Sequence, residues 1–260
     1  MEEGKGKYRP TDVPVGPADA VPARDKARDQ PSVDGLKAEL FGREVPEEYR
    51  ILALGETFVR LNAPYSFQLP HDVGVVPGAV IDVEVPDEQL TKFGQFLKSR
   101  VKGRSFFDLG ASEDSDAEKL AAGLGVGRYI GIDLDFQSNE HARRAGATEF
   151  YHVGEDLLKF VSQVKDQVGG VYYLSGLEPY ILQSDHRDNT PRKARIEKYC
   201  DQLLQEINRT LQHGDILILG IKTGGFCPDK FGFVKREFPE LQESKRGYQE
   251  ELTTRVYIKQ

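Results

Sequence analysis

Short apolar runs alternate with amphipathic stretches along the central part of the chain. The runs predict strands, because they are short and are bounded by glycine or polar turns. We expect strands at Ser105–Leu109, Arg128–Asp133, Thr148–Val153, Val171–Ser175 and Asp215–Ile221. The stretches between them predict helices at about 116–124, 138–145, 156–167 and 192–212. Strands that alternate with helices predict right-handed crossovers and an α/β fold with a doubly wound, mostly parallel sheet.

The pattern outside this region is less regular. We expect strands at Arg50–Leu61 and Val75–Val85, a helix over Asp87–Lys102 that Gly103 ends, and, after Pro228, a short helix followed by an extended end over Glu251–Lys259. The first 35 residues contain five of the 14 prolines and no Leu, Ile or Phe, so they cannot bury enough apolar surface to offset their ordering entropy. The predicted divisions are a disordered tail (1–35), an N-terminal β/α appendage or lid (36–103) and an α/β domain (104–260).

Composition narrows the possible functions. The chain has 35 basic and 42 acidic side chains, and the resulting charge of −7 disfavours a general nucleic-acid or anionic-membrane binder. No run approaches the roughly 20 apolar residues of a membrane span, and the first residues lack the apolar core of a secretory signal. Two cysteines, Cys200 and Cys227, favour a reducing, cytoplasmic location. The five histidines lack zinc-ligand spacing, so we expect no metal site.

The residues after the predicted strands are the candidates for binding, because open α/β sheets bind ligands at the carboxyl ends of their strands. Gly110 follows the first strand, and Asp133 ends the second strand 23 residues later. This arrangement suits adenosine: the glycine allows close approach of the backbone, and the carboxylate accepts hydrogen bonds from both ribose hydroxyls. Each residue also has a structural interpretation, since Gly110 can simply make the turn and Asp133 can cap the following helix.

Acidic residues around the first turn discriminate between adenosine ligands. A dinucleotide needs glycines where its pyrophosphate meets the helix N-terminus, but Ser112 and Ser115 occupy those positions. Three acids surround them, namely Glu113, Asp114 and Asp116. A carboxylate about 6 Å from a phosphate charge costs roughly 3 kcal/mol at an effective dielectric constant of about 20. S-adenosylmethionine has no phosphate, and acids attract its sulfonium and amino groups, so the charges favour it over NAD or ATP.

Residues from about 104 to 222 resemble the core of class I S-adenosylmethionine-dependent methyltransferases. The matching segments, in the family's order, are FFDLGAS, YIGIDLD, VGEDLLKF, VYYLSGLEPYIL and INRTLQHGDILIL. The resemblance implies a Rossmann-like fold, S-adenosylmethionine as cofactor, and methyl transfer to a small-molecule or protein acceptor, with RNA less favoured by the acidic balance.

The resemblance also implies a set of cofactor-binding residues. They are Asp108, Gly110, Ala111, Ser112, Asp133, Leu134, Glu155, Asp156 and Ser175. By position in the family, the turn after the first strand would lie against the methionyl part of the cofactor. Asp133 would hold the ribose, and Asp156 or its neighbour Glu155 would approach the adenine amino group.

The candidate catalytic residues are Glu178 and Tyr180. They lie in Leu177–Tyr180, where amino-methylating relatives carry Asn/Asp-Pro-Pro-Tyr, and only the last two positions match. Glu178 would act as a general base or orient the acceptor, although a solvated loop acid fits its position equally well. The first loop departs from the family's D-x-G-x-G-x-G, because Ser112 and Asp114 replace the later glycines. A methyltransferase-like binding or regulatory protein without activity is therefore the alternative function, and another adenosine-using transferase is a less favoured one.

Overall fold

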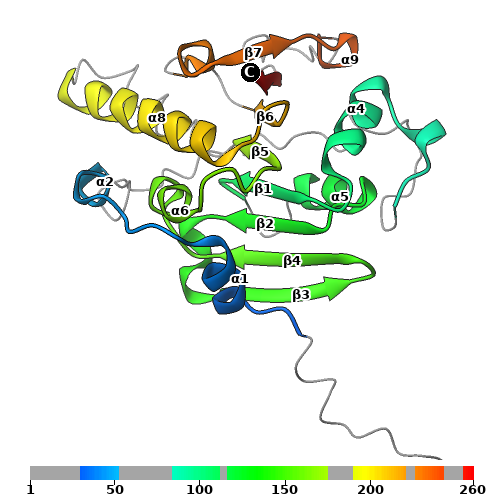
Figure 1. Cartoon of the computed structure of the whole chain (residues 1–260), viewed down its shortest axis with the longest axis horizontal. Helices are drawn as coiled ribbons and strands as arrows, with labels where there is room; N and C mark the ends of the chain where they lie inside the picture. Colours follow the sequence, from blue (N-terminus) through cyan, green and yellow to red (C-terminus); the bar gives the residue numbers. More distant parts are fainter. Residues whose placement is uncertain (1–29, 53–83, 112–115, 175–189, 221–225, 243–253) are drawn as a thin grey trace, which may run out of the picture. The chain divides into compact units, whose positions relative to one another are not determined.

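The fold is built on one β-sheet, whose strands lie between residues 105 and 259. The computed structural model describes residues 30–52, 84–111, 116–174, 190–220, 226–242 and 254–260. Within these ranges eight strands form a sheet in the order β3-β4-β2-β1-β5-β6-β8-β7 (Figure 1). They are β1 (Ser105–Leu109), β2 (Arg128–Ile132), β3 (His141–Ala145), β4 (Thr148–Val153), β5 (Val171–Leu174), β6 (Ile216–Leu219), β7 (Phe233–Arg236) and β8 (Arg255–Lys259). Strands β4, β2, β1, β5 and β6 are parallel, whereas β3 and β8 run antiparallel to their neighbours.

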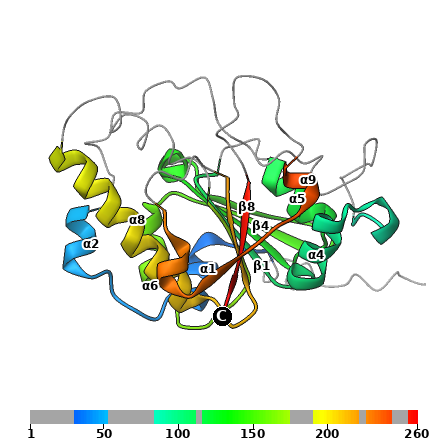
Figure 2. The same ribbon diagram turned by 90° about the horizontal axis from the view of Figure 1, so that it is seen from above.

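Helices cover both faces of this sheet. Figure 2 shows α4 and α5 on one side, and α1, α6 and α8 on the other. The helices are α1 (Val33–Leu40), α2 (Glu47–Leu52), α4 (Lys92–Val101), α5 (Asp116–Gly123), α6 (Leu157–Gln163), α8 (Thr190–Thr210) and α9 (Pro239–Gln242), with 3₁₀-helices η1 (Asp87–Gln89), η2 (Leu134–Ser138) and η3 (Pro228–Phe231). The predicted α/β fold with a doubly wound, mostly parallel sheet is confirmed.

Two apolar cores lie between the sheet and these helices. On the α6 and α8 side, the rings of Phe107 and Tyr172 stack with centroids 4.4 Å apart, and Leu203 of α8 is buried in the same core. On the other side, Phe93 of α4 and Leu120 of α5 are fully buried against the sheet. The parallel strands are therefore covered on both faces, which explains their nearly continuous apolar sequences. Helix α4 lies in the predicted appendage, yet residues 31–260 form one compact unit, so the lid role remains a prediction.

Most predicted elements of the central region are confirmed. Strands β1 and β4 have the predicted bounds, β2 ends one residue earlier and β6 is shorter than predicted, and β5 matches as far as the structure describes it. Helix α8 begins and ends two residues earlier than predicted, and the short helix after Pro228 is η3. Helix α6 ends at Gln163 because Val164 leaves the helix to form a β-bridge with Phe41.

Several local expectations are wrong. The segment predicted as a helix over 138–145 forms strand β3, which pairs with β4 through a hairpin at Gly146. Residues 50–52 are helical in α2, and residues 33–35, assigned to the tail, begin α1. Residues 87–91 precede helix α4 rather than open it, because the Thr91 hydroxyl accepts the Gly94 amide at 3.0 Å as an N-cap. Strand β7 and helix α9 were not predicted, and residues 53–83 lie outside the described ranges.

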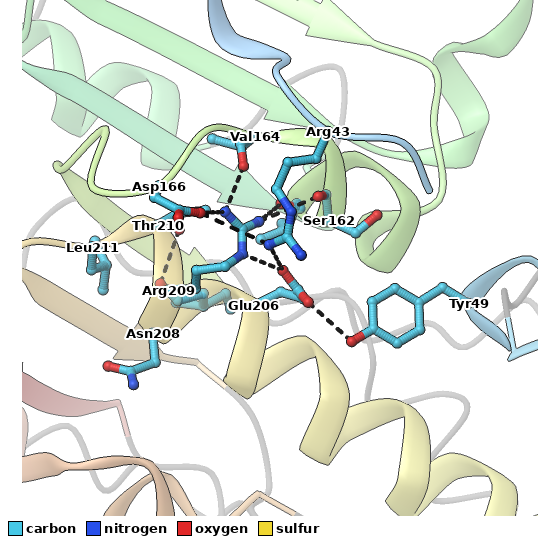
Figure 3. Close-up of polar contacts among 12 residues, drawn as sticks. Arg43, Tyr49, Ser162, Val164, Asp166, Glu206, Asn208, Arg209, Thr210 and Leu211 are labelled. Carbon is cyan, nitrogen blue, oxygen red and sulfur yellow. Dashed lines mark hydrogen bonds and ion pairs between the residues drawn. The ribbon is translucent and has the colours of Figure 1, made fainter. Parts of the chain in front are cut away.

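A polar cluster fastens the segment that joins α1 and α2 to the helices behind it (Figure 3). Arg209 of α8 donates to Glu206 at 2.6 Å and to the backbone oxygen of Val164 at 2.7 Å. Glu206, which is buried, also accepts a hydrogen bond from the Tyr49 hydroxyl at 3.0 Å. Arg43 lies 3.6 Å from the same carboxylate. The cluster therefore connects the N-terminal segment to α6 and α8.

Candidate functional site

The strand order places a topological switch point at β1. From β1 the chain proceeds outward through β2 and β4 on one side, and through β5 and β6 on the other. Ligands of open α/β sheets bind outside the carboxyl ends of the strands at such a point. The turns that follow β1, β2 and β4 are therefore the described part of the candidate site, and they are neighbours because these strands pair directly.

The turn after β1 depends on Gly110. Its φ of +89° lies in the region that side chains disfavour, so the glycine is required by the turn itself. The Gly110 amide donates to the oxygen of Ile132 at 2.8 Å, and the Ala111 amide reaches the same oxygen at 3.3 Å. The backbone after β1 thus bends over the end of β2. The structural interpretation of Gly110 is confirmed, and its contact with a ligand remains a prediction.

Asp108 lies beneath this turn and is fully buried in β1. Its carboxylate accepts a hydrogen bond from the Tyr129 hydroxyl of β2 at 2.6 Å. A buried carboxylate is stable only when it is hydrogen-bonded, and this bond also joins the two strands whose ends form the site. The contact places Asp108 as a support for the turn, while its cofactor role remains a prediction.

Asp133 follows β2 and is half-buried. Its carboxylate accepts the Asp135 amide at 2.9 Å and so caps η2, as the structural interpretation anticipated. The Asp133 amide donates to the oxygen of Val153 at 3.1 Å, which fixes the residue against the end of β4. Leu134, the first residue of η2, is also half-buried. Ribose binding by Asp133 remains a prediction that this cap does not test.

Asp156 caps helix α6 from a buried position. One carboxylate oxygen accepts the Lys159 amide at 3.1 Å, and the other accepts the Tyr199 hydroxyl of α8 at 3.3 Å. Burial raises the pKa of Tyr199 well above its usual value, and the negative charge of Asp156 adds to this effect. These contacts hold α6 against α8, so they give Asp156 a structural role of its own.

Glu155 has a different environment from its neighbour. Its side chain is half-buried, and within the described ranges it makes no hydrogen bond or ion pair. Burial raises the pKa of its carboxyl group, and the nearby charges of Asp156 and Glu140 add to this, whereas Lys37 and Lys159 oppose it. Of the two acids that the sequence offered for the adenine amino group, Glu155 is thus the one whose carboxylate accepts no hydrogen bond from the described residues, whereas Asp156 accepts two.

The remaining predicted site residues lie outside the described ranges. They are Ser112, Ser175, Glu178 and Tyr180. Within the ranges that are described, no cluster of three or more His, Cys, Asp or Glu side chains has a metal-binding arrangement. Among the helices described here, none combines the length and the apolar character needed to cross a membrane.

Sequence reasoning missed the role of Gly154 and Glu140. A Cβ atom on Gly154 would lie 2.3 Å from the backbone of Gln137, so no side chain fits there. The Gly154 amide donates to the Glu140 carboxylate at 2.8 Å. The glycine after the strand was visible in the sequence, but its contact with η2 arises only from tertiary packing.

Comparison with known proteins finds similarity in structure but not in sequence. No family model matches the chain, and no curated protein matches it by sequence. The N-methyltransferase NodS from Bradyrhizobium japonicum is 13% identical, with 64% of this chain and 90% of that one covered and a TM-score of 0.39. A TehB-like SAM-dependent methyltransferase from Corynebacterium glutamicum is 15% identical over 61% and 82% of the two chains, with a TM-score of 0.37. Because these similarities are low, the fold assignment above rests on the sheet itself.

Proposed function

We propose that this protein is an S-adenosylmethionine-dependent methyltransferase acting on a small molecule or a protein side chain. The observation that carries the proposal is the set of groups at the switch point: the positive-φ turn at Gly110 and the carboxylates of Asp133 and Glu155. They follow the paired strands β1, β2 and β4. Methionyl, ribose and adenine contacts would therefore succeed one another along a single edge of the sheet.

The chemistry of these groups fits that cofactor. Carboxylates accept hydrogen bonds, and the ribose hydroxyls and the adenine amino group are donors. Asp133 would accept from the ribose and Glu155 from the adenine, while the backbone at Gly110 and Ala111 would approach the methionyl part together with Ser112. Leu134 and Ser175 would border the same site from the ends of β2 and β5. When bound, the cofactor supplies a methyl group on a sulfonium centre.

On the acceptor side, Glu178 and Tyr180 are the proposed catalytic residues. Glu178 would accept a proton from the acceptor or orient it, because it follows the strand next to β1 at the switch point. Methyl transfer to a good nucleophile depends mainly on alignment of the reacting atoms. One carboxylate and one tyrosine hydroxyl would therefore be sufficient to orient the acceptor and to take up its proton.

The test of this function is an assay for S-adenosylhomocysteine release. Purified protein and S-adenosylmethionine are incubated with separate small-molecule, protein and RNA pools from a cell extract. We expect release with the small-molecule or the protein pool, and slower turnover with unchanged cofactor affinity in Glu178→Gln. Cofactor binding without release in any pool would instead support the regulatory alternative, to which Ser112 and Asp114 in the first loop point.

A further inference from the structure

We infer that Glu140 and Lys37 are positioning residues for the turn after β4, so that helix α1 sets the affinity of the cofactor site. This inference rests on the proposed function, because it concerns the same site. It assigns a role to two side chains that lie outside the matching segments of the family. Its support is a chain of contacts from α1 through Glu140, the residue before β3, to Gly154, which directly precedes Glu155.

A single carboxylate oxygen joins the three elements. Oε1 of Glu140 accepts the Gly154 amide at 2.8 Å and the Lys37 ammonium group at 2.9 Å. Both side chains are partly shielded, with relative exposures of 28% for Glu140 and 24% for Lys37. Charge-assisted hydrogen bonds of this kind are shorter and stronger than neutral ones. Lys37 thus holds the Glu140 carboxylate directed at the amide of the turn.

The turn held in this way is packed against the neighbouring loop. Because a Cβ atom on Gly154 would lie 2.3 Å from the Gln137 backbone, the turn after β4 and the 3₁₀-helix η2 are in direct contact. Asp133 caps η2, and its amide bonds the end of β4. The proposed ribose and adenine contacts therefore belong to two loops that pack directly on each other, and Glu140 binds the second of them through the Gly154 amide.

The same two residues contribute to the electrostatic environment of Glu155. Four charged groups act on it: Lys37 from α1, Lys159 from α6, Asp156 at the helix cap and Glu140 just before β3. Lys37 lowers the pKa of the Glu155 carboxyl group, whereas Glu140 raises it. Removing Lys37 is therefore expected to raise this pKa, and removing Glu140 is expected to lower it.

Isolated surface ion pairs contribute little to stability. Substitution of Glu140 or Lys37 is therefore expected to displace the turn after β4 rather than to unfold the protein. Misplacement of a binding group by about 1 Å can cost up to ~100-fold in function. The loss of one charge-assisted bond to the turn is therefore expected to appear in ligand affinity and in the protection of the Gly154 amide, while the melting temperature stays nearly unchanged.

The experiment compares four variants of the full chain for S-adenosylhomocysteine binding by calorimetry. Glu140→Ala and Lys37→Met are expected to weaken binding about tenfold and about threefold. Glu140→Gln, which keeps an oxygen for the Gly154 amide but loses the ion pair with Lys37, should weaken binding only about threefold, as Lys37→Met does. The matched control is Glu39→Gln, which removes the other ion pair of α1, a 2.7 Å contact with Arg128 at the amino end of β2. Its affinity should stay within twofold of the wild type.

A second readout needs no ligand. In Glu140→Ala the Gly154 amide should exchange with solvent at least tenfold faster by NMR. The Glu155 carboxyl group should titrate at higher pH in Lys37→Met and at lower pH in Glu140→Gln. Unchanged exchange in Glu140→Ala, or equal loss of affinity in the Glu39→Gln control, would overturn the inference. If the wild type binds no S-adenosylhomocysteine, the proposed function fails, and the positioning role is then decided by Gly154 exchange and Glu155 titration alone.

Discussion

At the scale of single residues, Glu155 lowers the stability of the ligand-free protein at neutral pH. Its carboxyl group is half-buried without a partner among the described residues, and burial raises its pKa. A raised pKa means that the folded state favours the protonated acid. The stabilisation that results is complete below the unfolded-state pKa and is lost as pH rises through the folded-state pKa. At neutral pH the ionised group therefore lowers the free energy of unfolding.

We predict that Glu155→Gln raises the melting temperature at pH 7 and leaves it unchanged near pH 4. The same substitution should weaken S-adenosylhomocysteine binding about fivefold, because a neutral hydrogen bond replaces a charge-assisted one. It should also abolish the loss of binding that we expect in the wild type as the carboxylate protonates in acid. Thermal unfolding and calorimetry at both pH values are the measurements. A variant that is less stable at pH 7 and binds normally would show that Glu155 only supports the fold.

Part of the site is predictable at this scale and part is not. Gly110 and Asp133 follow strands that their apolar sequences reveal, so their place at the sheet edge follows from the pattern. The choice between Asp156 and Glu155 does not, because it depends on the Tyr199 hydroxyl of α8, 43 positions later, which takes up an oxygen of Asp156. Contacts between elements distant in sequence leave no local signal.

At the scale of elements, strand β3 shows packing overriding local propensity. Its sequence, HARRA, contains good helix formers, and it was predicted as a helix. In the structure the Arg143 guanidinium lies 4.1 Å from the Phe150 ring centroid, and the His141 and His152 rings stack at 4.4 Å. These cross-strand pairs with β4 stabilise a strand where the isolated segment would favour a helix.

Glu118 links the hairpin of β3 and β4 to α5, the helix in which it lies. It accepts a hydrogen bond from Arg143 and lies 3.2 Å from Nε2 of His152. Burial opposes its ionisation, but His152 and Arg143 outweigh burial and lower the pKa of Glu118 below its usual value. With a depressed pKa, the stabilisation is present above the unfolded-state pKa and is lost as pH falls through the folded-state pKa.

We predict that Glu118→Gln lowers the free energy of unfolding by about 1–2 kcal/mol at pH 7, since it weakens a partly buried charged hydrogen bond. The difference should vanish at acid pH, where the wild-type carboxylate is protonated. Urea unfolding at both pH values measures it. As a control, Glu237→Gln removes an exposed pair with Lys235 and should change stability by less than about 0.5 kcal/mol. A loss that persists unchanged in acid would refute the ionic explanation.

The contact between α2 and α8 gives another prediction. Tyr49→Phe removes the hydroxyl that donates to buried Glu206 at 3.0 Å, so it should cost about 1–2 kcal/mol of unfolding free energy. Burial first, and then the hydrogen bond with Glu206, raises the pKa of Tyr49 to about 12. The hydroxyl therefore stays protonated, and the cost should be constant from about pH 6 to about pH 10. Denaturation curves that coincide for the two proteins would show that this contact contributes nothing.

At the scale of the whole molecule, the predictable part is the region where each strand is covered on both faces. There the apolar runs are nearly continuous, and the alternation of strands and helices specifies the parallel sheet. Strands β7 and β8 enter the sheet by antiparallel pairing after β6. Only the second of them was anticipated, as an extended end, because the four-residue strand β7 has one buried position. Short edge strands of this kind carry too little apolar pattern to be recognised.

The central claim is that the switch point binds an adenosyl ligand through acids rather than a phosphate through helix amides. The most direct measurement is isothermal titration of the full chain at pH 7 with S-adenosylhomocysteine and, separately, with NAD. The account predicts a micromolar dissociation constant for S-adenosylhomocysteine and no binding heat with NAD. Asp133→Ala should weaken the first interaction by about 2–3 kcal/mol, the sum of two charge-assisted hydrogen bonds. Tight binding of NAD, or no response to S-adenosylhomocysteine, would contradict the account.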